Sequence, residues 1–167
     1  MRVRGGVGVL LLGLVVAGCG EDTTAARECT QPRNPKHQVE ACTRVISANA
    51  KSAEAFNNRC QAYNQLEDTN KAIADCNAAL KLEPRNASAF NNRGWSYEIR
   101  REYDLALADY TKAIEINSRF ALAYANRGDV YFKKGDKQKA ATEYRLALEI
   151  DPQNDIAVNG LKRLGLR

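Results

Sequence analysis

Between residues 53 and 154, a pattern of residue types recurs three times at a fixed period of about 34 residues. Aromatic, small and alanine residues return at the same places in each copy. The clearest columns are Phe56, Phe90 and Tyr124; Cys60, Gly94 and Gly128; Tyr63, Tyr97 and Tyr131; Ala72, Ala106 and Ala140; Cys76, Tyr110 and Tyr144; and Ala79, Ala113 and Ala147. A period of this length is typical of an array in which each copy is one supersecondary unit.

The middle copy, residues 87–120, indicates what each unit folds into. Its second half carries apolar residues at intervals of three and four, the spacing of one buried helical face. These residues are Tyr103, Ala106, Leu107, Tyr110, Ala113, Ile114 and Ile116. A polar turn at residues 100–102 separates this helix from a first amphipathic helix, in which the small Gly94 allows close approach of its partner. Aromatic rings fill the space beside such glycines. Because one helix pair cannot cover its own apolar face, we expect the copies to stack.

These columns resemble the tetratricopeptide repeat (TPR) family over residues 53–154. The resemblance implies an all-α fold, a right-handed solenoid of antiparallel helix pairs. Its three full repeats would be residues 53–86, 87–120 and 121–154, within a domain covering residues 36–167. Arg59, Arg93 and Arg127 form a further column, which we interpret as structural, bonding between repeats.

Two flanking helices are predicted beside the repeats. Asn34 can cap a helix that runs to Ala50, with Pro35 in its first turn. Its Cys42 falls in the column of Cys76, so this segment resembles the second helix of a degenerate first repeat. A capping helix is expected over residues 155–166. Residues 19–35 combine small and charged residues with prolines and show no apolar period, so we expect a tether, flexible in its first part.

Residues 1–18 read as a signal peptide. Arg2 and Arg4 provide a positive start, and residues 7–16 form an apolar run too short to span a bilayer. The Val-Ala-Gly-Cys sequence that ends at Cys19 resembles the bacterial lipobox, which implies cleavage before Cys19 and acyl chains, palmitate among them, that anchor the protein. The alternative is an ordinary secretory signal with a chance cysteine. Gly20 replaces the aspartate that favours inner-membrane retention in enterobacteria, so we expect the outer membrane, facing the periplasm.

If Cys19 carries lipid, four cysteines remain, an even number in an exported chain, where oxidising compartments favour disulfides. Three pairings are possible. Cys60 and Cys76 should lie at similar height on the two helices of one repeat, which favours this bridge together with Cys29–Cys42. A Cys42–Cys60 bridge is also possible, because these two cysteines would lie at similar height on helices joined by a turn. Four buried free thiols are the remaining alternative.

Several classes of function have little support in the sequence. The net charge is +5, or +3 without Arg2 and Arg4, which is too small and too dispersed to indicate nucleic-acid binding. His37 is the only histidine, so neither a Ser–His or Cys–His pair nor a metal site is expected. No glycine-rich phosphate loop is present. We therefore expect a non-enzyme that binds no cofactor, metal or small-molecule substrate.

The candidate surface is the concave face formed by the first helix of each repeat. Asparagine amides, which both donate and accept, recur there at the repeat spacing and could hold the backbone of an extended peptide, as in similar asparagine ladders of some peptide-binding TPR proteins. Trp95 lies one turn away and could anchor a ligand. The predicted peptide-binding residues are Asn57, Asn58, Asn91, Asn92, Trp95, Asn126, Asp129 and Lys133. The alternative is that the asparagines only bond to neighbouring helices.

We therefore expect a membrane-anchored TPR adaptor of the bacterial cell envelope, binding a segment of another envelope protein through this face. The lysines and arginines of the carboxylate clamp in chaperone-binding TPRs are missing, so a free C-terminal carboxylate is not the expected ligand. The alternative is a structural subunit of an envelope assembly that uses its outer face or stack ends. Mutations in the groove that leave association unchanged would favour this alternative.

Overall fold

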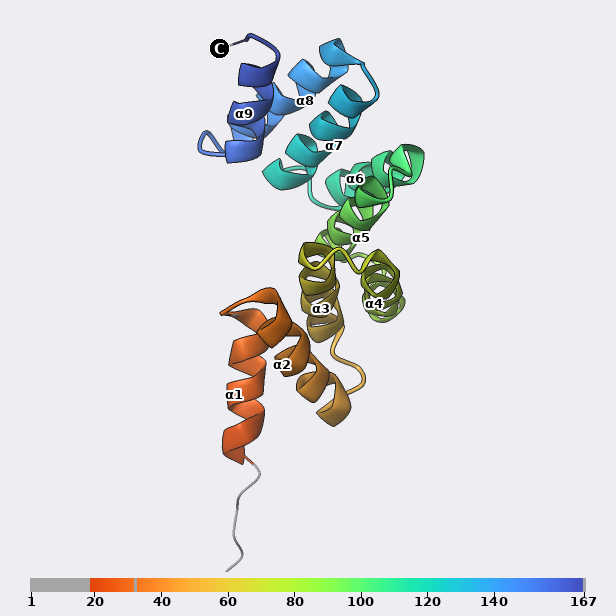
Figure 1. Ribbon diagram of the computed structural model, residues 1–167, viewed down its shortest axis with the longest axis vertical. Helices are drawn as coiled ribbons and strands as arrows, with labels where there is room; N and C mark the ends of the chain where they lie inside the picture. Colours follow the sequence, from red (N-terminus) through yellow and green to blue (C-terminus); the bar gives the residue numbers. More distant parts are fainter. Residues whose placement is uncertain (1–18, 32, 167) are drawn as a thin grey trace, which may run out of the picture.

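The computed structural model describes residues 19–31 and 33–166 of the 167-residue chain. Within these ranges the chain forms nine α-helices: α1 (Cys19–Thr30), α2 (Pro35–Ala48), α3 (Ala53–Gln65), α4 (Thr69–Leu82), α5 (Ala87–Ile99), α6 (Tyr103–Ile116), α7 (Ala121–Lys133), α8 (Lys137–Ile150) and α9 (Asp155–Arg163). They stack in chain order into an elongated body, with α1 and α9 at opposite ends (Figure 1). The predicted all-α fold with three repeats and flanking helices is confirmed. None of the helices described is long and apolar enough to cross a bilayer.

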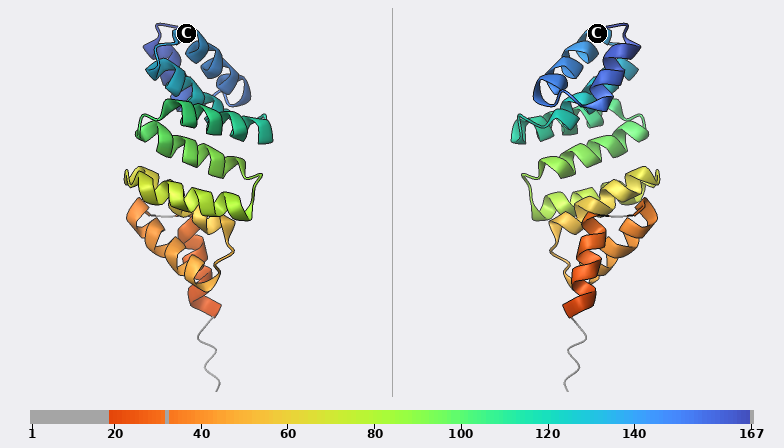
Figure 2. Two further views of the ribbon diagram at one scale, coloured as in Figure 1. Left: turned by 90° about the vertical axis from the view of Figure 1, so that its right-hand side faces the viewer. Right: turned by 90° about the vertical axis from the view of Figure 1, so that its left-hand side faces the viewer.

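Each repeat is an antiparallel helix pair: α3 with α4, α5 with α6, and α7 with α8. The first helices also contact one another along the stack, and the layered order is plain in side views (Figure 2). The turn inside each pair needs one residue with a left-handed backbone, and Glu67, Arg101 and Gly135 fill this same position in the three repeats. Asparagine, serine or aspartate side chains cap six of the helices by accepting from the backbone N–H three residues on; these are Asn34, Ser52, Asp68, Asn86, Asp136 and Asn154.

Small residues and aromatic rings interlock within each pair, as the columns predict. A Cβ added at Gly94 would lie 2.9 Å from the Tyr110 ring, and one added at Gly128 would lie 2.8 Å from the Tyr144 ring. In the first repeat the same two columns hold Cys60 and Cys76 instead. The structure joins these cysteines by a disulfide, with their Cα atoms 5.5 Å apart. A covalent bridge thus stands in the first repeat where a glycine–ring contact stands in the others.

The arginine column links successive units, which confirms its structural interpretation. Arg93 donates from Nε and Nη2 to both carboxylate oxygens of Asp109 at 2.7 Å, across its own helix pair, and from Nη1 to Asn77 of the preceding unit at 2.6 Å. Arg59 and Arg127 repeat this arrangement in the units on either side, with Asp75 and Thr43, and with Glu143 and Thr111. Paired guanidinium–carboxylate bonds of this kind fix orientation as well as adding energy.

The prediction that residues 19–35 form a tether, flexible in its first part, is wrong, because Cys19–Thr30 forms helix α1 and packs on α2 and α3. Its own sequence has no helical apolar stripe, but long-range bonds hold it. Cys29 is buried and forms a disulfide with Cys42, and Gln38 donates from Nε2 to the Cys29 carbonyl oxygen at 3.0 Å. Glu28 also accepts from Arg44 at 2.8 Å. The predicted signal peptide, residues 1–18, lies outside the described residues.

Candidate functional site

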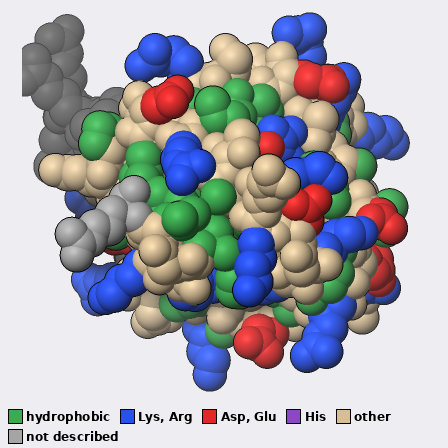
Figure 3. All heavy atoms as spheres, turned by 90° about the horizontal axis from the view of Figure 1, so that it is seen from above, with side chains coloured by type: hydrophobic (Ala, Val, Ile, Leu, Met, Phe, Trp, Pro, Cys, Tyr) green, Lys and Arg blue, Asp and Glu red, His purple; other side chains and the backbone are tan. Residues whose placement is uncertain are grey.

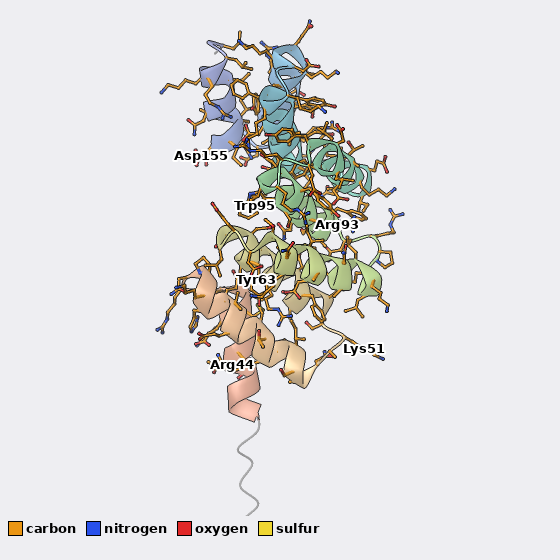
Figure 4. All side chains as sticks on the ribbon, turned by 45° about the vertical axis from the view of Figure 1, so that its right-hand side comes forward. Arg44, Lys51, Tyr63, Arg93, Trp95 and Asp155 are labelled. Carbon is orange, nitrogen blue, oxygen red and sulfur yellow. A yellow bond between two sulfur atoms is a disulfide. The ribbon has the colours of Figure 1, made fainter. Side chains whose placement is uncertain are left out.

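The pocket that gathers most of the predicted binding residues lies on the face formed by the first helices of the pairs. It has a volume of about 350 Å³ and is lined from four helices, α3, α5, α7 and α9. The lining residues are Gln61, Asn91, Asn92, Trp95, Glu98, Leu122, Asn126, Asp129, Lys133 and Ile156. Trp95 and Arg93 leave α5 on different sides, and Trp95 faces the side on which α9 begins at Asp155 (Figure 4). The arginine column and this pocket therefore lie on different faces of the stack.

Of the eight predicted peptide-binding residues, the structure brings six together around this pocket: Asn91, Asn92, Trp95, Asn126, Asp129 and Lys133. Asn57 does not line it, but accepts a hydrogen bond from Asn92 at 2.9 Å. Asn58 lies instead in a smaller pocket of about 140 Å³ near the N-terminal end, beside Cys29 and Ala55. The predicted row of asparagines is therefore divided between two pockets.

The asparagines bond to one another between units, as the alternative interpretation states. Asn92 donates from Nδ2 to Oδ1 of Asn57, and Asn126 donates from Nδ2 to Oδ1 of Asn91 at 3.0 Å. Each link uses one donor and one acceptor. Within the described part of the chain, Nδ2 of Asn91 and Oδ1 of Asn92 and Asn126 keep no protein partner. The amides therefore both hold the units together and retain hydrogen-bonding capacity toward the pocket.

Glu98 is a buried carboxylate on the pocket wall, with a side chain 8% exposed. It accepts from the Tyr110 hydroxyl at 2.6 Å and from Nζ of Lys133 at 2.7 Å. Burial, followed by the nearby Glu98 charge, raises the pKa of Tyr110 well above its ordinary value. The tyrosine thus stays a neutral donor to the carboxylate, and Lys133 compensates the remaining charge from the next unit.

Asp129 has an equivalent arrangement one unit further on. Its Oδ1 accepts from the Tyr144 hydroxyl at 2.6 Å and forms an ion pair with Arg163 of α9. Burial and the hydrogen bond to Asp129 raise the pKa of Tyr144. The Arg163 guanidinium also lies over the Phe132 ring, 4.9 Å from its centroid. Both acidic residues of the pocket are therefore paired with a cation and a tyrosine hydroxyl.

Two apolar residues of the pocket, Leu122 and Ile156, are absent from the predicted site. They lie one period apart and so occupy the same repeat position. The earlier units hold Glu54 and Ser88 there. The change from polar to apolar along this column was a signal available in the sequence. Among the described side chains, no cluster of three or more histidine, cysteine, aspartate or glutamate residues is placed to hold a metal ion.

Comparison with protein families matches the tetratricopeptide repeat at residues 53–86, 87–120 and 121–154, more than half of the chain. The chain belongs to the tetratricopeptide repeat family. No curated protein sequence matches it. Among solved structures, it is similar to the TPR domain of Arabidopsis OM64, with 30% identity over 68% of this chain and 94% of that one, and a TM-score of 0.65.

Two further structures share the fold at lower identity. TTC0263, a TPR protein of Thermus thermophilus, gives a TM-score of 0.76 with 18% identity over 87% of this chain and 81% of its own. The first TPR of Spaghetti (RPAP3), bound to the HSP90 peptide SRMEEVD, gives 0.64 with 23% identity over 70% and 93%. At these identities the likeness concerns the fold alone.

Proposed function

We propose that this protein is an adaptor of the bacterial cell envelope that binds a segment of a partner protein through the pocket on its first helices. Tetratricopeptide repeats are protein-interaction modules, and RPAP3 was solved with a peptide segment of its partner. The observation that carries the proposal is the pocket itself, which crosses successive units. It combines a half-buried Trp95 with amide atoms of Asn91, Asn92 and Asn126 that have no hydrogen-bond partner in the part of the chain that the structure describes. Such a surface suits an extended chain, whose backbone donates and accepts in alternation.

The anchoring part of the proposal is that Cys19 is lipidated and holds the protein to a membrane, the outer membrane facing the periplasm. It is supported by the lipobox-like sequence before Cys19. Cys19 begins α1, at the opposite end of the stack from α9 (Figure 1). An anchor there would present the pocket and the C-terminal end away from the lipid surface. The two disulfides of the structure, Cys29–Cys42 and Cys60–Cys76, support this location, because disulfides form and persist in oxidising compartments.

The alternative, a structural subunit of an envelope assembly that leaves the pocket unused, also has an observation in its favour. Large apolar side chains are exposed away from the pocket; Leu105 of α6 is 49% exposed, and Val158 and Leu166 at the C-terminal end are 45% and 38% exposed. Figure 3 looks onto this end and shows hydrophobic atoms in its middle, with lysines and arginines among and around them. Surfaces of this kind can serve as contacts in larger assemblies.

A crosslinking pull-down from solubilised envelopes of the source cell, with residues 20–167 as bait, separates the two. The pocket variant combines Trp95→Ala with Leu122→Ser, because replacing Asn92 or Asn126 would also cut bonds between units. The matched control is Leu105→Ser, an exposed leucine outside the pocket. A partner retained by the control and lost by the pocket variant, with unchanged circular dichroism, supports the adaptor. Equal retention by both variants, or loss from the Leu105→Ser control with retention by the pocket variant, refutes pocket binding and favours the structural subunit.

The anchor has its own test. The full chain is expressed in a bacterial host that is fed a fatty acid carrying an alkyne, and lipidated protein is detected by attaching a fluorophore to the alkyne. We expect label on the wild type and none on Cys19→Ser, with the wild type in the membrane fraction. Export and cleavage without any label would contradict the lipoprotein proposal and leave an ordinary secreted protein.

A further inference from the structure

The pocket has an apolar corner made by three successive units. Trp95 of α5 and Ile156 of α9 are half-buried, and Leu122 of α7 is 38% exposed. In the column of Leu122 and Ile156 the earlier units carry Glu54 and Ser88. This column therefore changes along the stack, from polar side chains in the first two repeats to apolar side chains in α7 and α9.

The charges around this corner cancel one another. Glu98 is paired with Lys133, and Asp129 with Arg163, while a tyrosine hydroxyl donates to each carboxylate. Two carboxylates thus face two cations, and neither carboxylate lacks a partner. A charged ligand side chain entering here would lose hydration without finding an unpaired opposite charge, which is costly. An uncharged apolar side chain would gain by leaving water.

The rest of the pocket requires hydrogen-bonding groups on the ligand. Nδ2 of Asn91 and Oδ1 of Asn92 and Asn126 have no protein partner within the described residues. A peptide backbone offers one donor and one acceptor per residue and can pair with such atoms. A hydrocarbon chain would cover them without replacing the water they lose. The volume of about 350 Å³ leaves room for a stretch of backbone beside a single large side chain.

We infer that the ligand of this pocket is an extended, internal protein segment that inserts one large uncharged apolar side chain between Trp95, Leu122 and Ile156, while the asparagine amides bind its backbone. This inference rests on the proposed function and specifies the chemistry of its partner. The ligand's anchor position excludes aspartate, glutamate, lysine and arginine, and no terminal carboxylate is needed.

The only tryptophan of the chain is Trp95, so its fluorescence reports on this corner alone. Residues 20–167 are used to select peptides from a displayed random library, and selected peptides are titrated while Trp95 emission is followed. We expect one large apolar residue to be common to the selected peptides and to shift the emission to the blue. Replacing that residue by alanine should weaken Kd about 30-fold or more, the effect of an interface hot spot, and replacing it by aspartate should weaken Kd further.

The matched protein variants are Leu122→Asp in the pocket and Leu105→Asp on α6. The first should weaken Kd at least about 10-fold, since it places an unpaired charge in the corner, and the second should leave Kd unchanged. Selection of no peptide at all refutes the proposed function. Selection of peptides that need a charged anchor, or that leave Trp95 emission unshifted, overturns the inference while sparing the proposed function. A blue shift with lauric acid in the absence of any selected peptide assigns the corner to acyl chains and overturns the inference.

Discussion

Replacing Gly160 by alanine should push α9 away from the stack. A Cβ built at Gly160 would lie 2.5 and 2.6 Å from Cε2 and Cε1 of the Tyr144 ring, and closer still to Cζ. The ring has no room to retreat, because Gly128 of α7 also lies against it, and a Cβ there would be 2.8 Å from Cε1 and 2.9 Å from Cδ1. The ring is also fully buried, and Asp129 holds its hydroxyl at 2.6 Å.

The expected loss follows from two opposing effects. Overpacking of a filled core costs about 1 to 3 kcal/mol, and contacts as short as these place Gly160→Ala at the upper end. Alanine in place of glycine stabilises a helix interior by about 1 kcal/mol, because glycine has a low helix propensity. The net destabilisation is therefore about 2 kcal/mol, which corresponds to a fall in Tm of about 4 to 8 °C for a domain of this size. Because α9 carries Ile156, peptide binding should weaken as well.

Urea denaturation followed by circular dichroism measures this effect. The matched control is Asn159→Ala, which introduces the same residue at the neighbouring exposed position of α9 and should change stability by less than about 0.5 kcal/mol. In a Tyr144→Leu background, which removes the ring, the additional cost of Gly160→Ala should largely disappear. A Gly160→Ala protein as stable as the wild type, or an equal cost with and without the ring, would refute the steric explanation.

Three further outcomes follow from the structure. Cys60→Ala with Cys76→Ala opens a bridge with a sequence separation of 16 and should lower the free energy of unfolding by about 3 kcal/mol, measured in urea against the wild type without reductant. Asp109→Asn leaves the guanidinium of Arg93 without its carboxylate and should cost about 3 kcal/mol, a loss that would be absent if the pair were fully solvated. Burial raises the pKa of Tyr110, so in the folded state this hydroxyl keeps its proton above the ordinary tyrosine pKa of about 10. The free energy of unfolding should therefore fall as pH rises past this value, because the unfolded chain loses the proton and the folded one does not. Tyrosinate absorbance should show that Tyr110 ionises only on unfolding.

Much of the architecture could be predicted from the sequence because it depends on local periodicity. The fixed repeat period gave the helix pairs, their boundaries and the columns that face inward, and it placed Cys60 opposite Cys76. Helix α1 could not be predicted this way. Its own residues have no apolar stripe, and its position depends on bonds from Cys29 to residues of α2, which are tertiary contacts.

The sequence by itself determined that the chain is a stack of helix pairs, because apolar spacing fixes which side of each helix is buried. It also determined that Asn91, Asn92 and Trp95 lie on first helices. Only the tertiary structure decided how these side chains are used. It turned the asparagines partly toward each other, placed Leu122 and Ile156 beside Trp95, and set the Tyr144 ring between Gly128 and Gly160. Apart from the contact of Gly128 with the Tyr144 ring, which lies within one repeat, these contacts join different units. They depend on the rotation from one unit to the next, which a period along the sequence does not specify.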